Sequence, residues 1–265
     1  MGEVDRLTSR FTIALEHYRA AERLYTADQN KWGISIALRG QAQVYLDTIR
    51  PLLADQLLKD ALSLLDPQES HDDVASLLTL IAENQLNLGF PESAEDYLRQ
   101  ARELSREKDV ENDYIRARLL LRTGRMDEGI ALLESLESIK EELDVSRPQR
   151  FHREASLLLS LFYTFKGDLE RAEIFAQHGI KIGNHLRSSF VQSVGVMRLG
   201  HCLQMSLGAN WSGDGYQKAI QYYEEAIQKV DIVRIHVEPL WVSAERLVTQ
   251  VSLKKPIRWR VRRLP

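Results

Sequence analysis

The chain has 265 residues, 44% of them hydrophobic, and a formal net charge of −3. This length allows a sizeable core, but no run of about 18 apolar residues is long enough to span a membrane. The first residues lack the pattern of a secretory signal, and Arg6 excludes the myristoylation motif that Gly2 would begin. Cys202 is the only cysteine, so we expect no internal disulfide and a reducing, cytoplasmic setting.

The predicted elements in residues 1–241 are helices that follow one another in pairs. The second helix of each pair begins its buried face with a small residue, in chain order Ala14, Ala54, Ala94, Gly129, Ala172 and Ala219. Apolar or small residues follow four and seven places later, as Leu98 and Ala101 follow Ala94, which puts them on one helix face. The small residues are therefore predicted to lie in the seams where two helices cross closely.

Glycine ends the first helix of three pairs, at Gly89, Gly124 and Gly167, five places before the small residue. Glycine adopts positive φ easily and can end a helix in a tight turn. The first helices themselves are predicted in "VASLLTLIAENQLNLG", "YIRARLLLRTG" and "ASLLLSLFYTFKG". No stretch alternates as a strand does, so the sequence predicts an all-α fold.

The small residues recur at intervals of 35 to 47 residues, against about 34 in a tetratricopeptide repeat. Long loops such as "DPQESHDD", "DVSRPQR" and "GANWSGDG" account for the difference. We predict a right-handed superhelical solenoid of about six antiparallel helix pairs with degenerate tetratricopeptide-like repeats, covering residues 1–241 as one array.

These unequal repeats resemble the tetratricopeptide-like superhelical region of MalT-type bacterial transcriptional activators, most clearly at "AIQYYEEAIQKVDIVRIHVEPLW". The resemblance implies a region that receives an inducer or protein partner, in chains that carry an ATPase module and a DNA-binding module elsewhere. This sequence contains no G-x-x-x-x-G-K-[ST] motif and no compact helix-turn-helix. It predicts a sensor array without output modules; the alternative is a free-standing adaptor that binds a peptide or protein segment, as the peptide-sensing tetratricopeptide proteins of Gram-positive bacteria do.

The first helix of each pair is expected to line a concave groove that receives a protein, a peptide or a small inducer. Counting back from the glycine and small-residue positions gives the groove candidates Arg39, Gln43, Thr79, Glu83, Asn87, Tyr114, Arg118, Arg122 and Arg198, with Leu157, Leu161 and Met205 beside them. The arginine side chains suit carboxylates. Arg118 and Arg122 are expected outside the helix seams, so that replacing both should remove recognition of an acidic partner and leave the fold intact.

No residue pattern predicts a catalytic, metal or cofactor site. The histidines form no H-x-x-x-H or H-E-x-x-H pair, and no G-x-S-x-G occurs. "GANWSGDG" lacks the Lys-Ser/Thr end of a phosphate loop and has the composition of an inter-helix turn. We expect no metal and no cofactor, and an enzyme subunit is the third and weakest hypothesis.

Residues 242–265 depart from the repeat, with seven Lys or Arg and one acidic residue. Residues 1–241 hold 28 basic and 37 acidic residues, a net charge of −9, which would repel a phosphate backbone. We interpret the tail as the product of a shifted reading frame and expect it to be poorly ordered, because permitted codons read one base earlier encode the repeat-like "AGKLEEA". The alternative is a basic arm that uses Trp259 and its neighbouring arginines to bind nucleic acid.

Overall fold

The computed structural model describes residues 1–105, 109–139, 150–208 and 214–229. In these ranges the chain forms helices and no strand, which confirms the predicted all-α class. The helices are α1 (Gly2–Leu7), α2 (Phe11–Ala27), α3 (Lys31–Asp47), α4 (Pro51–Ser63), α5 (His71–Leu88), α6 (Pro91–Leu104), α7 (Val110–Arg122), α8 (Met126–Ile139), α9 (Arg150–Lys166), α10 (Leu169–His185), α11 (Ser189–Leu207) and α12 (Asp214–Lys229). The proposed basic tail, residues 242–265, lies outside the described residues.

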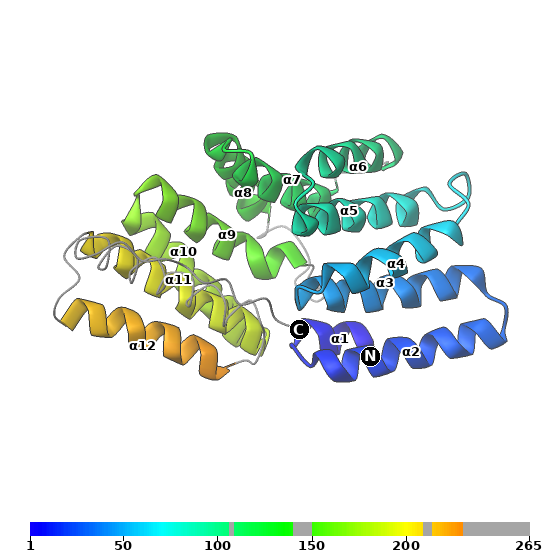
Figure 1. Ribbon diagram of the computed structural model, residues 1–265, viewed down its shortest axis with the longest axis horizontal. Helices are drawn as coiled ribbons and strands as arrows, with labels where there is room; N and C mark the ends of the chain where they lie inside the picture. The colour runs from blue at the N-terminus through cyan, green and yellow to red at the C-terminus, as the bar shows by residue number, and fades with distance from the viewer. Residues whose placement is uncertain (106–108, 140–149, 209–213, 230–265) are drawn as a thin grey trace, which may run out of the picture.

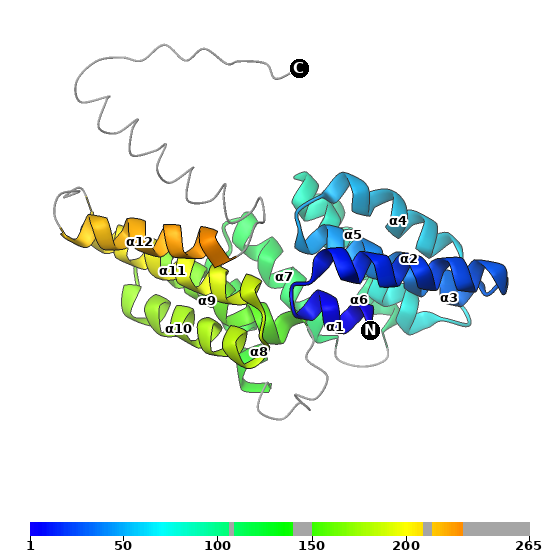
Figure 2. The same ribbon diagram turned by 90° about the horizontal axis from the view of Figure 1, so that it is seen from below.

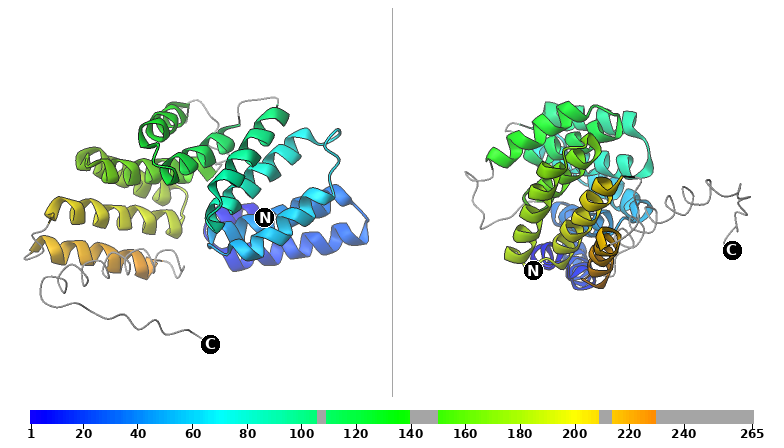
Figure 3. Two further views of the ribbon diagram at one scale, coloured as in Figure 1. Left: turned by 45° about the horizontal axis from the view of Figure 1, so that its top comes forward. Right: turned by 90° about the vertical axis from the view of Figure 1, so that its left-hand side faces the viewer.

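Each odd-numbered helix pairs with the even-numbered helix that follows it, and the pairs stack in chain order. Each odd-numbered helix also contacts the next odd-numbered helix, from α1 to α11, so these helices form a continuous inner row. Figure 1 shows the pairs following an arc, and Figures 2 and 3 show the same curvature from other directions. The arrangement is the predicted superhelical solenoid, in which each unit buries its apolar face against its neighbours.

The predicted seam positions are buried between the two rows of helices. Ala14, Ala54, Ala94, Ala172 and Ala219 have no exposed surface at all. Gly129 takes this place in the fourth pair, where an added Cβ would come within 2.7 Å of the Phe162 ring. This confirms that the helices cross closely at the small residues.

The turns that follow α1, α3, α5, α7 and α9 each contain one residue with a positive φ. Gly89, Gly124 and Gly167 have φ values of 92°, 77° and 83°, in the left-handed region expected for these glycines. Ser9 and Ile49 stand at the same place, five residues before Ala14 and Ala54, and have φ values of 66° and 53°. The first two pairs therefore make the same turn without glycine, at a cost in backbone strain.

Replacing Ile49 by glycine should raise the free energy of unfolding by about 0.5–1 kcal/mol. Left-handed backbone costs a non-glycine residue about 1–2 kcal/mol, and the greater freedom of glycine in the unfolded chain offsets part of that gain. The Ile49 side chain is 41% exposed, so its removal loses little burial. Urea denaturation measures the change; Gly124→Ala should shift stability the opposite way, and a loss of stability in Ile49→Gly would contradict the strain argument.

Capping side chains fix where several helices begin. The Asp109 carboxylate accepts hydrogen bonds from the backbone N–H groups of Glu111 and Asn112, both at 3.0 Å, before α7. Asp168 accepts from the N–H of Arg171 at 3.2 Å before α10. These acceptors satisfy N–H groups that a helix start leaves without a partner. In the described residues, no helix is apolar enough over a sufficient length to cross a membrane.

Candidate functional site

The inner row of helices encloses an open hollow near the middle of the arc. The hollow is small: its cavity volume is about 20 Å³, and the figure rises to about 310 Å³ only when the gaps between the lining atoms and the adjoining open solvent are included. Its lining comes from three successive inner helices, α7, α9 and α11, and consists of Tyr114, Arg118, Glu154, Leu157, Leu158, Phe190, Val194 and Arg198. Of the predicted groove residues, the structure thus brings together Tyr114, Arg118, Leu157 and Arg198.

Helical periodicity explains how one face of α11 reaches the hollow. Phe190, Val194 and Arg198 follow one another at intervals of four residues, so they lie on one side of the helix. The sequence prediction included Arg198 but missed Phe190, Val194, Glu154 and Leu158. Counting back one and two turns from Arg198 would have identified Val194 and Phe190 as inward-facing residues.

Arg118 connects α7 to α5 beside the hollow. Its guanidinium donates to the Glu83 carboxylate at 2.5 Å and to Asn87 Oδ1 at 3.1 Å. Glu83 is fully buried, whereas 17% of the Arg118 side chain is exposed. Because this arginine neutralises a buried carboxylate between two helices of the inner row, replacing it should disturb the fold, contrary to the expectation that the Arg118 variant would leave the fold intact.

A second polar pair also lines the hollow. The Tyr114 hydroxyl donates to Glu154 Oε2 at 2.8 Å, and both residues are buried. Arg198, only 2% exposed, contacts the His201 ring nitrogen Nδ1 at 3.1 Å. The hollow therefore combines an apolar part, made by leucine, valine and phenylalanine, with two guanidinium groups and one carboxylate.

The remaining predicted residues lie elsewhere along the array. Arg39 pairs with Asp73 at 3.2 Å, and buried Thr79 accepts from the Asn112 side-chain amide at 3.3 Å. The Arg122 guanidinium donates to the Leu86 carbonyl at 2.9 Å, in the last turn of α5, and the same carbonyl accepts from the Gly89 N–H at 3.2 Å.

Three further candidates stand on inner helices but do not line the hollow. Gln43 and Leu161 are partly buried on α3 and α9, and Met205 on α11 is 51% exposed. The inner row therefore carries the predicted set, but only part of the set gathers at one place.

The chemistry of the described residues offers no metal cluster. Within them, no three His, Cys, Asp or Glu side chains lie close enough together to hold a metal ion. Burial raises the pKa of the Cys202 thiol, which disfavours the reactive thiolate.

Comparison with known proteins supports the fold. No protein-family model matches the chain, and no curated protein does either. A solved Rap protein complexed with competence and sporulation factor superimposes with a TM-score of 0.64 at 17% identity, over 94% of this chain and 72% of that one. BtubC (BKLC) from P. vanneervenii gives a TM-score of 0.53 at 16% identity, over 99% and 97%.

These similarities concern architecture, because both sequences are less than 20% identical to this chain. They agree with a tetratricopeptide-like repeat solenoid. Neither structure is a MalT-type activator, so the resemblance to that family stays a prediction from the sequence.

Proposed function

We propose that this protein is a non-catalytic adaptor that binds a peptide or protein segment on its inner face, with the side chains around the hollow between α7, α9 and α11 moving apart to receive an apolar side chain. The proposal corresponds to the adaptor alternative from the sequence. The similarity to a Rap protein solved with competence and sporulation factor supports it as an analogy of fold.

The observation that carries the proposal is the composition of the hollow. Leu157, Leu158 and Val194 line the hollow with apolar side chains that are at least nine-tenths buried, so a side chain bound among them would be shielded from water. Arg118 and Glu154 stand at the same hollow with opposite charges. Such a mixture suits an apolar side chain flanked by the polar backbone of a peptide better than it suits a uniformly charged ligand.

The charge pattern also refines the expected partner. Arg118 is already paired with Glu83, and Arg39 with Asp73, so these guanidinium groups are partly neutralised. Recognition of a strongly acidic segment would have to compete with these internal carboxylates. We therefore propose a partner segment with an apolar anchor residue and a modest net charge.

Enlarging one side chain of the hollow should weaken partner binding about tenfold or more. Peptides are selected from a random library on the intact protein, and the affinity of the tightest is measured by fluorescence anisotropy. Val194→Met fills space that the anchor residue needs, and one methylene in a fitted pocket changes affinity by about 10–200-fold. Val194 is 2% exposed and lines the hollow.

The matched control is Val196→Met, because Val196 is a buried valine of the same helix that does not line the hollow. It should leave affinity within about twofold, because residues two apart on a helix face different directions. Equal losses in both variants would place the ligand elsewhere. Failure to select any peptide, together with a thermal shift on adding a sugar, would favour the small-inducer hypothesis.

A further inference from the structure

The first and last helix pairs of the array meet, although 179 residues separate the side chains that touch. The Ser9 hydroxyl lies 2.9 Å from the Ser188 hydroxyl, and the Phe190 N–H donates to Ser9 Oγ at 3.3 Å. Figures 1 and 2 show the turn between α1 and α2 facing the beginning of α11. Repeat arrays usually contact only neighbouring repeats. Here Ser9 and Phe11 of the first pair contact Ser188 and Phe190 at the beginning of α11, and we call this the closing contact.

Ser9 supplies a second cap to α11. Ser188 is the N-cap residue of this helix and accepts from the Val191 N–H at 3.4 Å. The Phe190 N–H is another of the first N–H groups that a helix leaves without an internal partner, and Ser9 accepts from it. Ser9 stands where three other pairs have glycine, and its hydroxyl makes a contact that glycine could not make.

The apolar half of the closing contact reaches the hollow directly. The Phe11 ring meets the Phe190 ring edge-to-face, with centroids 6.4 Å apart and planes at 80°. Phe11 packs against the buried cluster that includes Leu157, Phe190 and Val194, all of which line the hollow. Phe190 is only 1% exposed, so one wall of the hollow is held from behind by the first helix pair.

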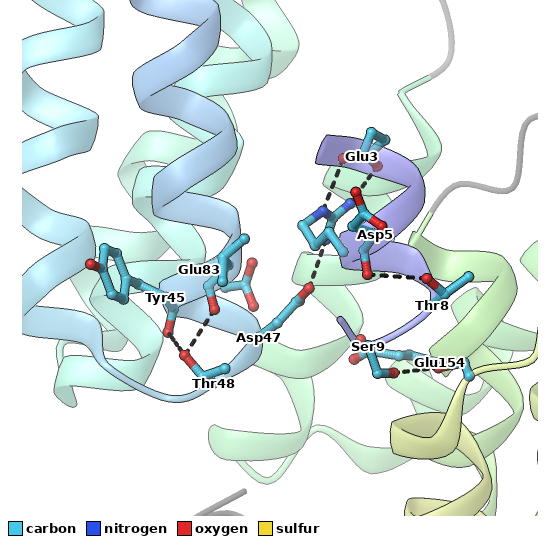
Figure 4. Close-up of polar contacts among 12 residues, drawn as sticks. Glu3, Asp5, Thr8, Ser9, Tyr45, Asp47, Thr48, Glu83 and Glu154 are labelled. Carbon is cyan, nitrogen blue, oxygen red and sulfur yellow. Dashed lines mark hydrogen bonds and ion pairs between the residues drawn. The ribbon is translucent and has the colours of Figure 1, made fainter. Parts of the chain in front are cut away.

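Buried ion pairs hold the turn that presents Ser9. Arg6 donates to the Asp47 carboxylate at 2.8 Å, and both side chains are almost completely buried. Asp5, 4% exposed, binds Arg10 at 2.6 Å and His17 at 2.8 Å. Figure 4 shows this group, with Asp47 on the α3 side and Ser9 on the side of α11. The turn between α1 and α2 is therefore fixed to both α2 and α3.

We infer that the closing contact couples closure of the array to binding in the hollow: docking of Ser9 and Phe11 on α11 positions Phe190, and a peptide seated against Phe190 favours the closed array. Ser9 and Phe11 are positioning residues that act through Phe190. Coupling of this kind is reciprocal. Opening the closing contact therefore lowers the affinity for the peptide, and the bound peptide stabilises the closing contact. This inference rests on the proposed function for its ligand, while closure itself can be tested alone.

Closure is tested by the variant Ser9→Cys/Ser188→Cys of the full chain. The two hydroxyl oxygens are 2.9 Å apart, close enough for thiols at the same positions to pair under mild oxidation. Cys202 is buried and its pKa is raised by that burial, so it should stay reduced. We expect a monomeric cross-linked species on a non-reducing gel, absent from each single cysteine variant; its absence would overturn closure.

Coupling is tested with the peptide selected on the wild-type protein. Phe11→Ala should lower the affinity for that peptide about tenfold. Adding the oxidised Ser9→Cys/Ser188→Cys cross-link to the Phe11→Ala variant should restore at least half of the lost affinity on a logarithmic scale. Phe165→Ala is the control, because Phe165 is 59% exposed and does not line the hollow. Circular dichroism confirms folding, and Phe11→Leu replaces Phe11→Ala if the latter does not fold.

The outcomes separate this inference from the proposed function. Unchanged affinity in Phe11→Ala, with the cross-link formed, would overturn the coupling and leave the adaptor function standing. If the library yields no peptide that binds the wild-type protein, the adaptor function is overturned, and the coupling with it. If Phe11→Ala lowers the affinity for the peptide and the cross-link does not restore it, the coupling is also contradicted. Closure would then not be what positions Phe190.

Discussion

Replacing Arg118 by alanine will lower the free energy of unfolding by about 3 kcal/mol. Glu83 is fully buried and receives a guanidinium hydrogen bond at 2.5 Å, and the variant leaves its carboxylate without that cation. Removing one partner of a buried ion pair costs about 3–5 kcal/mol; the partial exposure of Arg118 places the effect at the lower end. Urea denaturation followed by circular dichroism measures the loss.

Arg116→Ala is the matched control for this prediction, because Arg116 belongs to the same helix and is exposed. It should change stability by no more than about 0.5 kcal/mol. The double variant Arg118→Ala/Glu83→Gln should recover a large part of the loss, since the buried charge is then gone. Equal stability of the Arg118 and Arg116 variants would show that Glu83 does not depend on this pair.

Replacing Ala94 or Ala172 by leucine will destabilise the array by about 1–3 kcal/mol in each case. Both alanines are fully buried at helix crossings, where extra methyl and methylene groups force the helices apart or side chains out of their rotamers. For a chain of this size the melting temperature should fall by about 2–4 °C per kcal/mol. Thermal denaturation followed by circular dichroism is the measurement.

Glu95→Leu controls for the introduction of leucine, because Glu95 is exposed next to Ala94 on α6. Its melting temperature should stay close to that of the wild-type protein, since an exposed helix position tolerates leucine. Wild-type stability in both buried variants would mean that the seams can expand at no cost, against the close packing expected of protein interiors.

The sequence alone determined the repeat and the positions at which its helices cross and turn. The six small seam residues and the three glycine turns were all identified from their spacing, and all of them occur as predicted. This was possible because both features are local: a helix face repeats every three or four residues, and a left-handed turn favours glycine whatever surrounds it. Counting back from these positions also predicted which residues belong to the inner row of helices.

Only the tertiary structure decided which inner residues meet. The pairing of Arg118 with Glu83 depends on how far α7 slides along α5, and the hollow depends on three helices at once. The sequence offered Glu154 no signal of its own, and it could not show that arginine side chains chosen as ligand contacts are already paired within the array.

The closing contact is the clearest case of a feature outside the reach of the sequence. Small rotations between successive helix pairs add up along the solenoid. Their sum determines whether Ser9 lies in contact with the beginning of α11. Spacing within one repeat contains no information about that sum. Ser9 reads in the sequence as a glycine position occupied by serine, and its role as a cap for a helix 179 residues away follows only from the curvature of the whole array.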